Sequence, residues 1–194
     1  MLNRPIVLAS SSPYRRQILE RINLSFICHG PDIDESVLPG ESAPALVTRL
    51  SLAKAKAAAA HYPDGLIIGA DQVADHHGQI IGKPGGHEGA VAQLRAMSGS
   101  VITLYSGVAL YDATNDDAQS AVESFVVGFR ELDDDLIERY LKAERPYDCC
   151  GSLKVEGPGI ALLKCLKGAD PNTLIGLPLI RLIAMLKNAG VALV

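Results

Sequence analysis

The sequence predicts a mixed α/β fold, in which a twisted sheet with parallel and antiparallel strands is flanked by helices. Two observations carry this prediction. Short apolar runs alternate with helical patterns over roughly the first hundred residues, as in βα units. Two β-rich runs, 101–111 and 122–130, then follow each other directly, as in an antiparallel pair. With 194 residues, 48% of them apolar, the chain can bury a substantial core.

The first strand is expected at 6–9, and a loop of three serines follows it. Ser12 suits the N-cap of the next helix, and Pro13 suits its first position. The N–H groups at such a helix start are unpaired and favour an anion. Together with the three serine hydroxyls, they predict a cradle for an oxyanion.

The helix that starts at Pro13 carries two arginines. Arg15 shares a face with apolar residues, whereas Arg16 turns away from them. Arg15 is therefore the better candidate to neutralise phosphate through its forked donors. The alternative for Arg15 is an ordinary ion pair with the acidic loop at 30–40.

A short strand is expected at 24–28, and a long alanine-rich helix at 42–61. Lys54 lies within the apolar stripe of that helix, between Val47 and Leu50 on a helical projection. Lysine is rarely buried without a partner, so Lys54 needs an anion or a route into a cleft. The alternative is a lysine whose stem covers the core while its ammonium reaches water.

A buried strand is expected at 66–73, and it carries Asp71. A carboxylate at the end of such a strand is a frequent catalytic or metal-binding placement, and Val73 continues the apolar run, which argues against a turn cap. Glu35 in the acidic loop is a candidate second carboxylate, since two carboxylates with bound phosphate suit Mg²⁺. A solvated loop charge is the alternative for Glu35.

His76 and His77 with Gly78 predict a hairpin into a strand at 79–81, and they lack partners at metal-site spacing. Lys83 follows this strand between Gly82 and Pro84, where the backbone can come close to a ligand; a surface turn lysine is the alternative. The Pro-Gly-Gly run at 84–86 is the best candidate for a hinge between lobes.

The remaining elements follow from periodicity and from start and stop signals. A polar turn near Asn115 separates the two β-rich runs, and an acidic first turn favours the helix that follows them. The expected elements are a helix at 87–97, a helix at 133–143, a strand at 159–165 and a last helix at 178–188. No linker divides the chain, so residues 1–194 are expected to form one domain with two lobes.

Charge and cysteine content narrow the class of protein. The net charge of −4 argues against a nucleic-acid or anionic-membrane partner. No apolar run approaches membrane-spanning length, and no signal peptide is recognised. The four cysteines form no C-x-x-C pair, and the vicinal Cys149 and Cys150 would need strain to form a disulfide. A cytoplasmic protein in a reducing compartment is the expectation.

Taken together, these pieces resemble the Maf family of nucleotide pyrophosphatases along nearly the whole chain. The resemblance rests on the Leu-Ala-Ser-x-Ser-Pro-x-Arg-Arg signature at 8–16 and on the order of the motifs after it. Those motifs are Asp34-Glu35, Lys54-Ala55, Gly69-Ala70-Asp71, Gly82-Lys83-Pro84 and Gly176-Leu177-Pro178-Leu179.

The resemblance implies hydrolysis of a nucleoside triphosphate to the monophosphate and pyrophosphate, with Mg²⁺ or Mn²⁺ as cofactor. It also implies a Maf/ITPase-like fold with a cleft between two lobes, often as a homodimer. The positions that match the family's active site are Ser10, Arg15, Glu35, Lys54, Asp71 and Lys83. On this basis Asp71 is the expected proton acceptor, Glu35 and Asp71 the metal ligands, and Ser10, Arg15, Lys54 and Lys83 the phosphate ligands.

Three positions depart from the commonest family pattern: Tyr14 stands in place of arginine, Gln72 of threonine and Glu156 of glutamine. This trio looks like the YceF-like subgroup, whose members prefer 7-methyl-GTP. Methylation at N7 makes guanine cationic, and an aromatic face attracts a flat cation by about 0.5–2 kcal/mol. A carboxylate at Glu156 can accept from the guanine N–H edge. Without the family, surface exposure is the preferred interpretation for Tyr14 and Glu156.

Two other functions stay open at this point. One is the same chemistry on dTTP and UTP, although the arginine–threonine–glutamine trio expected for it is absent. The other is a non-catalytic regulator of cell division that binds a nucleotide or a protein. A pure binder has no need for Asp71 beside phosphate, which argues against the second.

Overall fold

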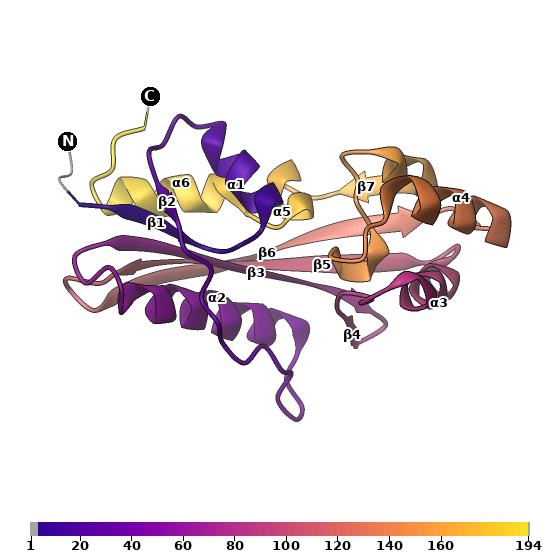
Figure 1. Ribbon diagram of the computed structural model, residues 1–194, viewed down its shortest axis with the longest axis horizontal. Coiled ribbons are helices and arrows are strands. Elements are labelled where there is room, and N and C mark those ends of the chain that lie inside the picture. Colours follow the sequence, from indigo (N-terminus) through magenta and orange to yellow (C-terminus); the bar gives the residue numbers. More distant parts are fainter. Residues whose placement is uncertain (1–3, 194) are drawn as a thin grey trace.

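One long mixed sheet runs through the molecule, with helices on both faces (Figure 1). The computed structural model describes residues 4–193. The strand order is β2-β1-β3-β5-β6-β7, and β4 also pairs with β3. The first three strands are parallel and the other pairs are antiparallel, which confirms the predicted mixed α/β class. The strands are β1 (Ile6–Ala9), β2 (Ile27–Cys28), β3 (Leu66–His76), β4 (Gln79–Ile81), β5 (Val101–Asp112), β6 (Asp117–Phe129) and β7 (Leu163–Lys167).

Helices cover the two faces of the sheet unequally. In Figure 1, α2 lies along one face, while α1 and α6 lie on the other. The α-helices are α1 (Pro13–Glu20), α2 (Ala43–Ala59), α3 (His87–Met97), α4 (Asp134–Glu144), α5 (Pro171–Ile175) and α6 (Leu179–Asn188). Two 3₁₀ turns, η1 (Cys150–Ser152) and η2 (Pro158–Leu162), follow α4. None of the helices in residues 4–193 has the length and apolar character needed to cross a membrane.

The expected start signals of the helices are present. The Ser12 hydroxyl accepts from the Arg15 N–H at 3.4 Å, and Pro13 occupies the first turn of α1. The Asp133 carboxylate accepts from the Leu136 N–H at 2.7 Å and caps α4. At the β3–β4 hairpin, His77 and Gly78 both have positive φ, 54° and 81°, as a type I′ turn requires.

Three elements differ from the sequence prediction. The strand expected at 159–165 is split, because η2 occupies its first half and β7 starts only at Leu163. Pro158 lacks an N–H and suits a first helical turn. The apolar residues after it led to the prediction of a strand instead. The strand expected at 24–28 pairs only at Ile27–Cys28, and both residues are exposed. Helix α5 was not predicted, because five residues are too few to show a helical period.

Helix α2 packs on the sheet with backbone against backbone. A Cβ at Gly69 of β3 would lie 1.9 Å from the Ser51 carbonyl oxygen, and one at Gly107 of β5 would lie 2.2 Å from the Val47 carbonyl oxygen. Only glycine fits such distances. These two glycines therefore set how closely α2 approaches the sheet.

One edge of β3 is open over a short stretch. Along the edge opposite β5, β1 pairs with β3 as far as Gly69, and β4 pairs with it from Ala74 onward. Residues 70–73 of β3 lie between these two partners. The sheet therefore has a gap in the middle of β3, at the point where Asp71 stands.

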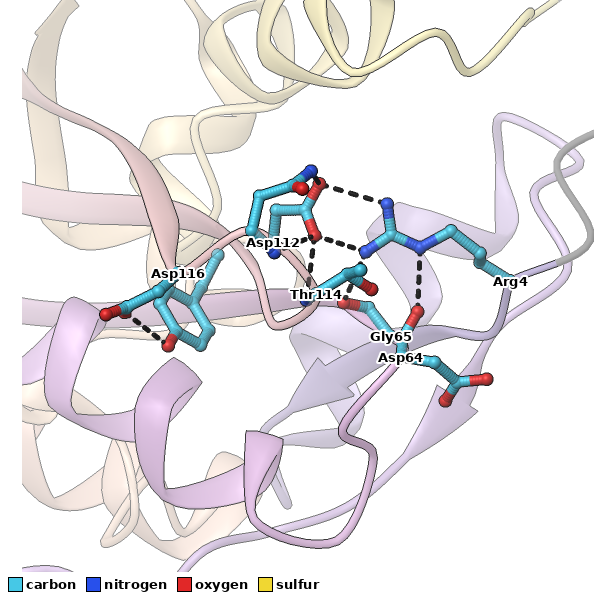
Figure 2. A network of polar contacts seen from close by, with 8 residues as sticks. Arg4, Asp64, Gly65, Asp112, Thr114 and Asp116 are labelled. Carbon is cyan, nitrogen blue, oxygen red and sulfur yellow. Dashed lines mark hydrogen bonds and ion pairs between the residues drawn. The ribbon is translucent and has the colours of Figure 1, made fainter.

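A polar clasp joins the chain before β1 to the loop before β3 and to the end of β5 (Figure 2). The Arg4 guanidinium pairs with both oxygens of the Asp112 carboxylate and donates to the carbonyls of Asp64, at 2.7 Å, and Gly65, at 3.3 Å. These interactions lower the pKa of Asp112 well below its usual range, chiefly through the Arg4 bond. The clasp lies at the β1 start, away from the gap in β3.

Candidate active site

A cleft of about 520 Å³ opens at the gap in β3, a size that suits a nucleotide. Its walls come from the loop after β1, from the loop at 30–40, from α1, α2, α5, β3 and β4, and from the segment after α4. The predicted site residues all line it: Ser10, Tyr14, Arg15, Glu35, Lys54, Asp71, Gln72, Lys83 and Glu156. Segments up to 146 residues apart in the chain thus meet at one cleft, from Ser10 to Glu156.

Lys54 occupies the centre of the cleft. Its ammonium donates to Asp71 Oδ1 at 2.7 Å and pairs with Glu35 Oε1 at 2.8 Å. Lys54 and Asp71 are 7% and 5% exposed, whereas half of the Glu35 side chain is open to solvent. The buried Lys54 therefore has the anionic partner that it required. Helix α2 brings Lys54 to β3, which it approaches closely at Gly69.

The serine loop and α1 form the neighbouring wall. The buried Ser10 hydroxyl accepts from the Ser12 N–H at 3.1 Å and from Arg15 Nη1 at 3.4 Å. Arg15 Nε donates to the Gly176 carbonyl at 2.9 Å. Arg15 is therefore held by the chain segment after α5, and the alternative ion pair with the acidic loop is not formed. Arg16 points outward and pairs with Glu20.

Gln72 points away from Asp71, because neighbouring residues of a strand face opposite sides of the sheet. Its amide Nε2 donates to Ser106 Oγ at 2.9 Å and to the carbonyls of Thr173, at 2.7 Å, and Leu174, at 3.3 Å. These bonds tie β3 to α5. Gln72 thus lines the cleft while its amide nitrogen is engaged by protein acceptors.

The segment after α4 covers the gap in β3. The Cys150 thiol donates to the Gln72 carbonyl at 3.0 Å, an acceptor that a neighbouring strand would otherwise use. The Gly151 N–H donates to the Gly82 carbonyl at 3.1 Å, beside Lys83. This segment places Cys149, Asp148 and Glu156 near Tyr14. Burial, and after it these neighbours, raise the pKa of the Tyr14 hydroxyl.

Sequence reasoning missed several residues that shape the cleft. Lys154 lines it and stacks over the Tyr14 ring, with its ammonium 5.7 Å from the ring centroid. Gly176 was placed in a family motif without a role, and its carbonyl proves to orient Arg15. The one available signal for Lys154 was its position in the sequence, two residues before Glu156. Nothing local in the sequence signalled the Gly176 contact, which spans 161 positions.

The donor set at the centre of the cleft bears on the predicted metal. In residues 4–193, no three His, Cys, Asp or Glu side chains gather as a metal-binding group. Asp71 and Glu35 are brought together by Lys54, and they supply carboxylate oxygens of the kind that Mg²⁺ prefers. Mg²⁺ usually binds through one or two carboxylates together with substrate phosphates. The residues therefore fit a metal that arrives with its nucleotide.

Comparisons with known proteins agree on one family. A family profile described as "Maf-like protein" matches residues 5–189. A protein of Polaromonas sp. (strain JS666) named 7-methyl-GTP pyrophosphatase is 51% identical over 98% of this chain and 87% of its own length. Proteins of the same name from Pseudomonas syringae pv. tomato and Pseudomonas aeruginosa are 52% and 51% identical, each over 96% of this chain and 97% of their own length.

Proposed function

The chain belongs to the Maf family, and from this premise we propose that it hydrolyses 7-methyl-GTP to 7-methyl-GMP and pyrophosphate. The observation that carries the proposal is the continuity of one cleft, from the buried Lys54–Asp71 pair to the Tyr14 ring. Relatives at about half identity over nearly their whole length bear the same activity in their names. One nucleotide would span this cleft, with its triphosphate near Lys54 and Asp71 and its base near Tyr14.

In the proposed reaction, water attacks the α-phosphorus and the bond to the β-phosphate oxygen breaks. Asp71 accepts the proton of the attacking water. Its place at the gap in β3 supports this role, because it is buried yet lines the cleft. Lys54 holds the Asp71 carboxylate in position through their 2.7 Å hydrogen bond.

Positive groups around the cleft would bind the triphosphate and stabilise the departing pyrophosphate. Arg15, Lys54 and Lys83 line the cleft and supply this charge. Ser10 and the N–H groups at the start of α1 would bind phosphate oxygens. The bond from Arg15 to Gly176 supports a fixed guanidinium, which lowers the cost of ordering it on binding.

Mg²⁺ or Mn²⁺ would be held by the carboxylates of Glu35 and Asp71 together with phosphate oxygens. When bound, the metal would polarise the phosphoryl oxygens and offset their charge. Because no third metal-ligating side chain gathers with these two within residues 4–193, we expect little metal affinity without the nucleotide.

Tyr14, Gln72 and Glu156 would select the base. A cationic 7-methylguanine would lie against the Tyr14 ring, and the Glu156 carboxylate would accept from its N–H edge. Gln72 would contribute by shaping this wall, since its amide nitrogen already bonds to Ser106 and α5.

The test is pyrophosphate release with Mg²⁺ from 7-methyl-GTP, GTP, dTTP and UTP, followed by chromatography of the nucleotide product. We expect the highest kcat/KM for 7-methyl-GTP, with 7-methyl-GMP as product. Preference for dTTP and UTP would contradict the substrate. Release of inorganic phosphate and the diphosphate would contradict attack at the α-phosphorus, and no turnover of any nucleotide would favour a binding protein.

A further inference from the structure

Lys154 stands at the base end of the cleft, beside the residue proposed to receive the base. Its ammonium lies 5.7 Å from the centroid of the Tyr14 ring, within the range of a cation–π contact. The same ammonium pairs with the carboxylate of Glu144 at the end of α4. The Lys154 and Glu144 side chains are 28% and 11% exposed, so the pair is largely withdrawn from water.

The surrounding chain is built around this pair. The Tyr140 hydroxyl accepts from the Lys154 N–H and donates to the Ser152 carbonyl, both at 3.0 Å. A Cβ at Gly157 would lie 2.5 Å from Glu144 Oε2, and one at Gly159 would lie 2.2 Å from the Lys154 carbonyl oxygen. Gly157 thus leaves room for the Glu144 carboxylate, and Gly159 leaves room for the Lys154 backbone. Lys154 is thus held by its backbone and by its ammonium, and it is not a free surface lysine.

We propose that Lys154, held by Glu144, is a positioning residue that fixes the Tyr14 ring and thereby sets the preference for a cationic, N7-methylated guanine over an uncharged one. The inference rests on the proposed function and deepens it. A cation–π contact requires the cation within about 6 Å of the ring centroid, so the gain from N7 methylation depends on where the ring is held. Pairing with Glu144 also neutralises Lys154, which limits its repulsion of a cationic base.

This role predicts effects that are confined to base selection. Lys154 lies at the Tyr14 end of the cleft, whereas Lys54 and Asp71 pair at its centre. Loss of Lys154 should therefore raise KM for 7-methyl-GTP and leave kcat close to the wild-type value. A purely structural role would lower stability and affect all nucleotides alike.

The experiment measures the ratio of kcat/KM for 7-methyl-GTP over GTP in the wild type and in Lys154→Met. We expect the ratio to fall by about twofold to thirtyfold, the range that one cation–π contact spans. Lys154→Arg should restore most of the ratio, because a guanidinium can bind Glu144 and stack on Tyr14. Lys56→Met is the matched control, since Lys56 lies 5.5 Å from the Tyr111 ring centroid and neither residue lines the cleft.

A second variant guards against misfolding. Lys154→Met leaves the Glu144 carboxylate without its lysine, so Glu144→Gln/Lys154→Met removes both charges and should show the same fall in the ratio. An unchanged ratio in a folded variant, with a wild type that prefers 7-methyl-GTP, would overturn the role of Lys154 and leave the proposed function standing. An equal loss on both nucleotides would also overturn it. A wild type that hydrolyses both equally well would overturn both proposals.

Discussion

At the scale of single residues, the Lys54–Asp71 pair combines burial with access to a ligand. Both side chains are more than nine-tenths buried, yet both line the cleft. A buried charge without a partner is costly, so each residue depends on the other to compensate its burial. Loss of Lys54 or Asp71 is therefore expected to affect the cleft more than loss of a residue from an exposed pair, such as Arg95 with Asp134, would.

Asp71→Asn tests the proton acceptor. The amide keeps the shape of the carboxylate but cannot take a proton from water, so kcat for 7-methyl-GTP should fall by about 10²–10⁴-fold. The change is measured as pyrophosphate release, with the melting temperature recorded in parallel. Asp134→Asn, which alters a surface ion pair, should keep wild-type turnover. Normal turnover in a folded Asp71→Asn protein would exclude Asp71 as the base.

The cysteines divide into two reactivity classes. Burial raises the pKa of Cys149 to about 12 and that of Cys150 to about 11, so both are protonated at neutral pH. Because the thiolate is the nucleophile, iodoacetamide at pH 7.5 should label the exposed Cys28 and Cys165 first. Peptide mass spectrometry over time follows the labelling. Faster labelling of Cys149 or Cys150 would contradict this order and support a redox-sensitive cleft.

Residue-level prediction from sequence succeeded where the signal was local. Lys54 in an apolar stripe required an anion, and Ser12 with Pro13 marked the start of α1; both are confirmed. Gln72 was different, because its acceptors in Thr173 and Leu174 lie about a hundred positions away. Lys154 likewise could not be singled out from the sequence, because it contacts Tyr14, 140 positions earlier in the chain. Such contacts depend on the sheet bringing distant segments together.

At the scale of elements, the position of α2 decides whether the cleft can form. Gly69 and Gly107 allow the carbonyl oxygens of Ser51 and Val47 to approach β3 and β5. Lys54 is carried one turn beyond Ser51 and so reaches Asp71, two residues after Gly69. The helix periodicity predicted α2 well, but it did not predict the short distance between α2 and the sheet. The apolar pattern reports which face of the helix is buried and not how closely its backbone approaches the strands.

Gly69→Ala tests the seating of α2. The new methyl group would lie 1.9 Å from the Ser51 carbonyl oxygen, so α2 must shift. We expect a loss of about 1–3 kcal/mol in the free energy of unfolding, from urea denaturation, and lower kcat/KM as Lys54 moves. Gly86→Ala, with open space around its Cβ position, is the control. Equal stability of the two variants would contradict the close packing.

Element boundaries were least predictable where turns and strands share apolar residues. The run at 159–165 had the composition of a strand, yet Pro158 and the close approach of Gly159 to Lys154 favour a 3₁₀ turn there. Strand β6 starts at Asp117, five residues before the predicted start, because β5 supplies a continuous pairing partner to polar residues. Pairing therefore extends strands beyond what hydrophobicity reveals.

At the scale of the whole molecule, the Arg4–Asp112 clasp (Figure 2) lies apart from the cleft, since neither residue lines it. The clasp joins the chain before β1 to the loop before β3 and to the end of β5. Strand β1 is only four residues long, so this bidentate pair supports an element with few ladder bonds of its own. The clasp thus stabilises the strand from which the serine loop emerges.

The clasp predicts a pH-dependent loss of stability. The folded pKa of Asp112 is lowered, so its contribution is present above the ordinary aspartate pKa of about 3.9 and is lost as the pH falls below it. Arg4→Met should lower the free energy of unfolding by about 1–2 kcal/mol at pH 7. The difference from wild type should shrink as the pH falls to 3, as urea denaturation at each pH would show.

Arg16→Met is the control for this measurement, since Arg16 and Glu20 form an exposed pair of little expected worth. A difference between Arg4→Met and wild type that stays constant from pH 7 to pH 3 would contradict the assigned role of the Asp112 carboxylate.

The contacts between α4 and the segment that follows it, residues 149–157, have a consequence for how new specificities arise. Tyr140 and Glu144 hold this segment at Ser152 and Lys154, while the groups proposed to bind phosphate lie on β3, on α2 and on the chain near β1 and β4. On the proposed roles, selectivity and chemistry therefore lie on different stretches of the chain, except that Tyr14 stands beside Arg15 and Gln72 follows Asp71 on β3. Replacing this segment together with Tyr14 and Gln72 by those of a relative with a different preference is therefore the most direct route to redirect this scaffold toward another nucleobase.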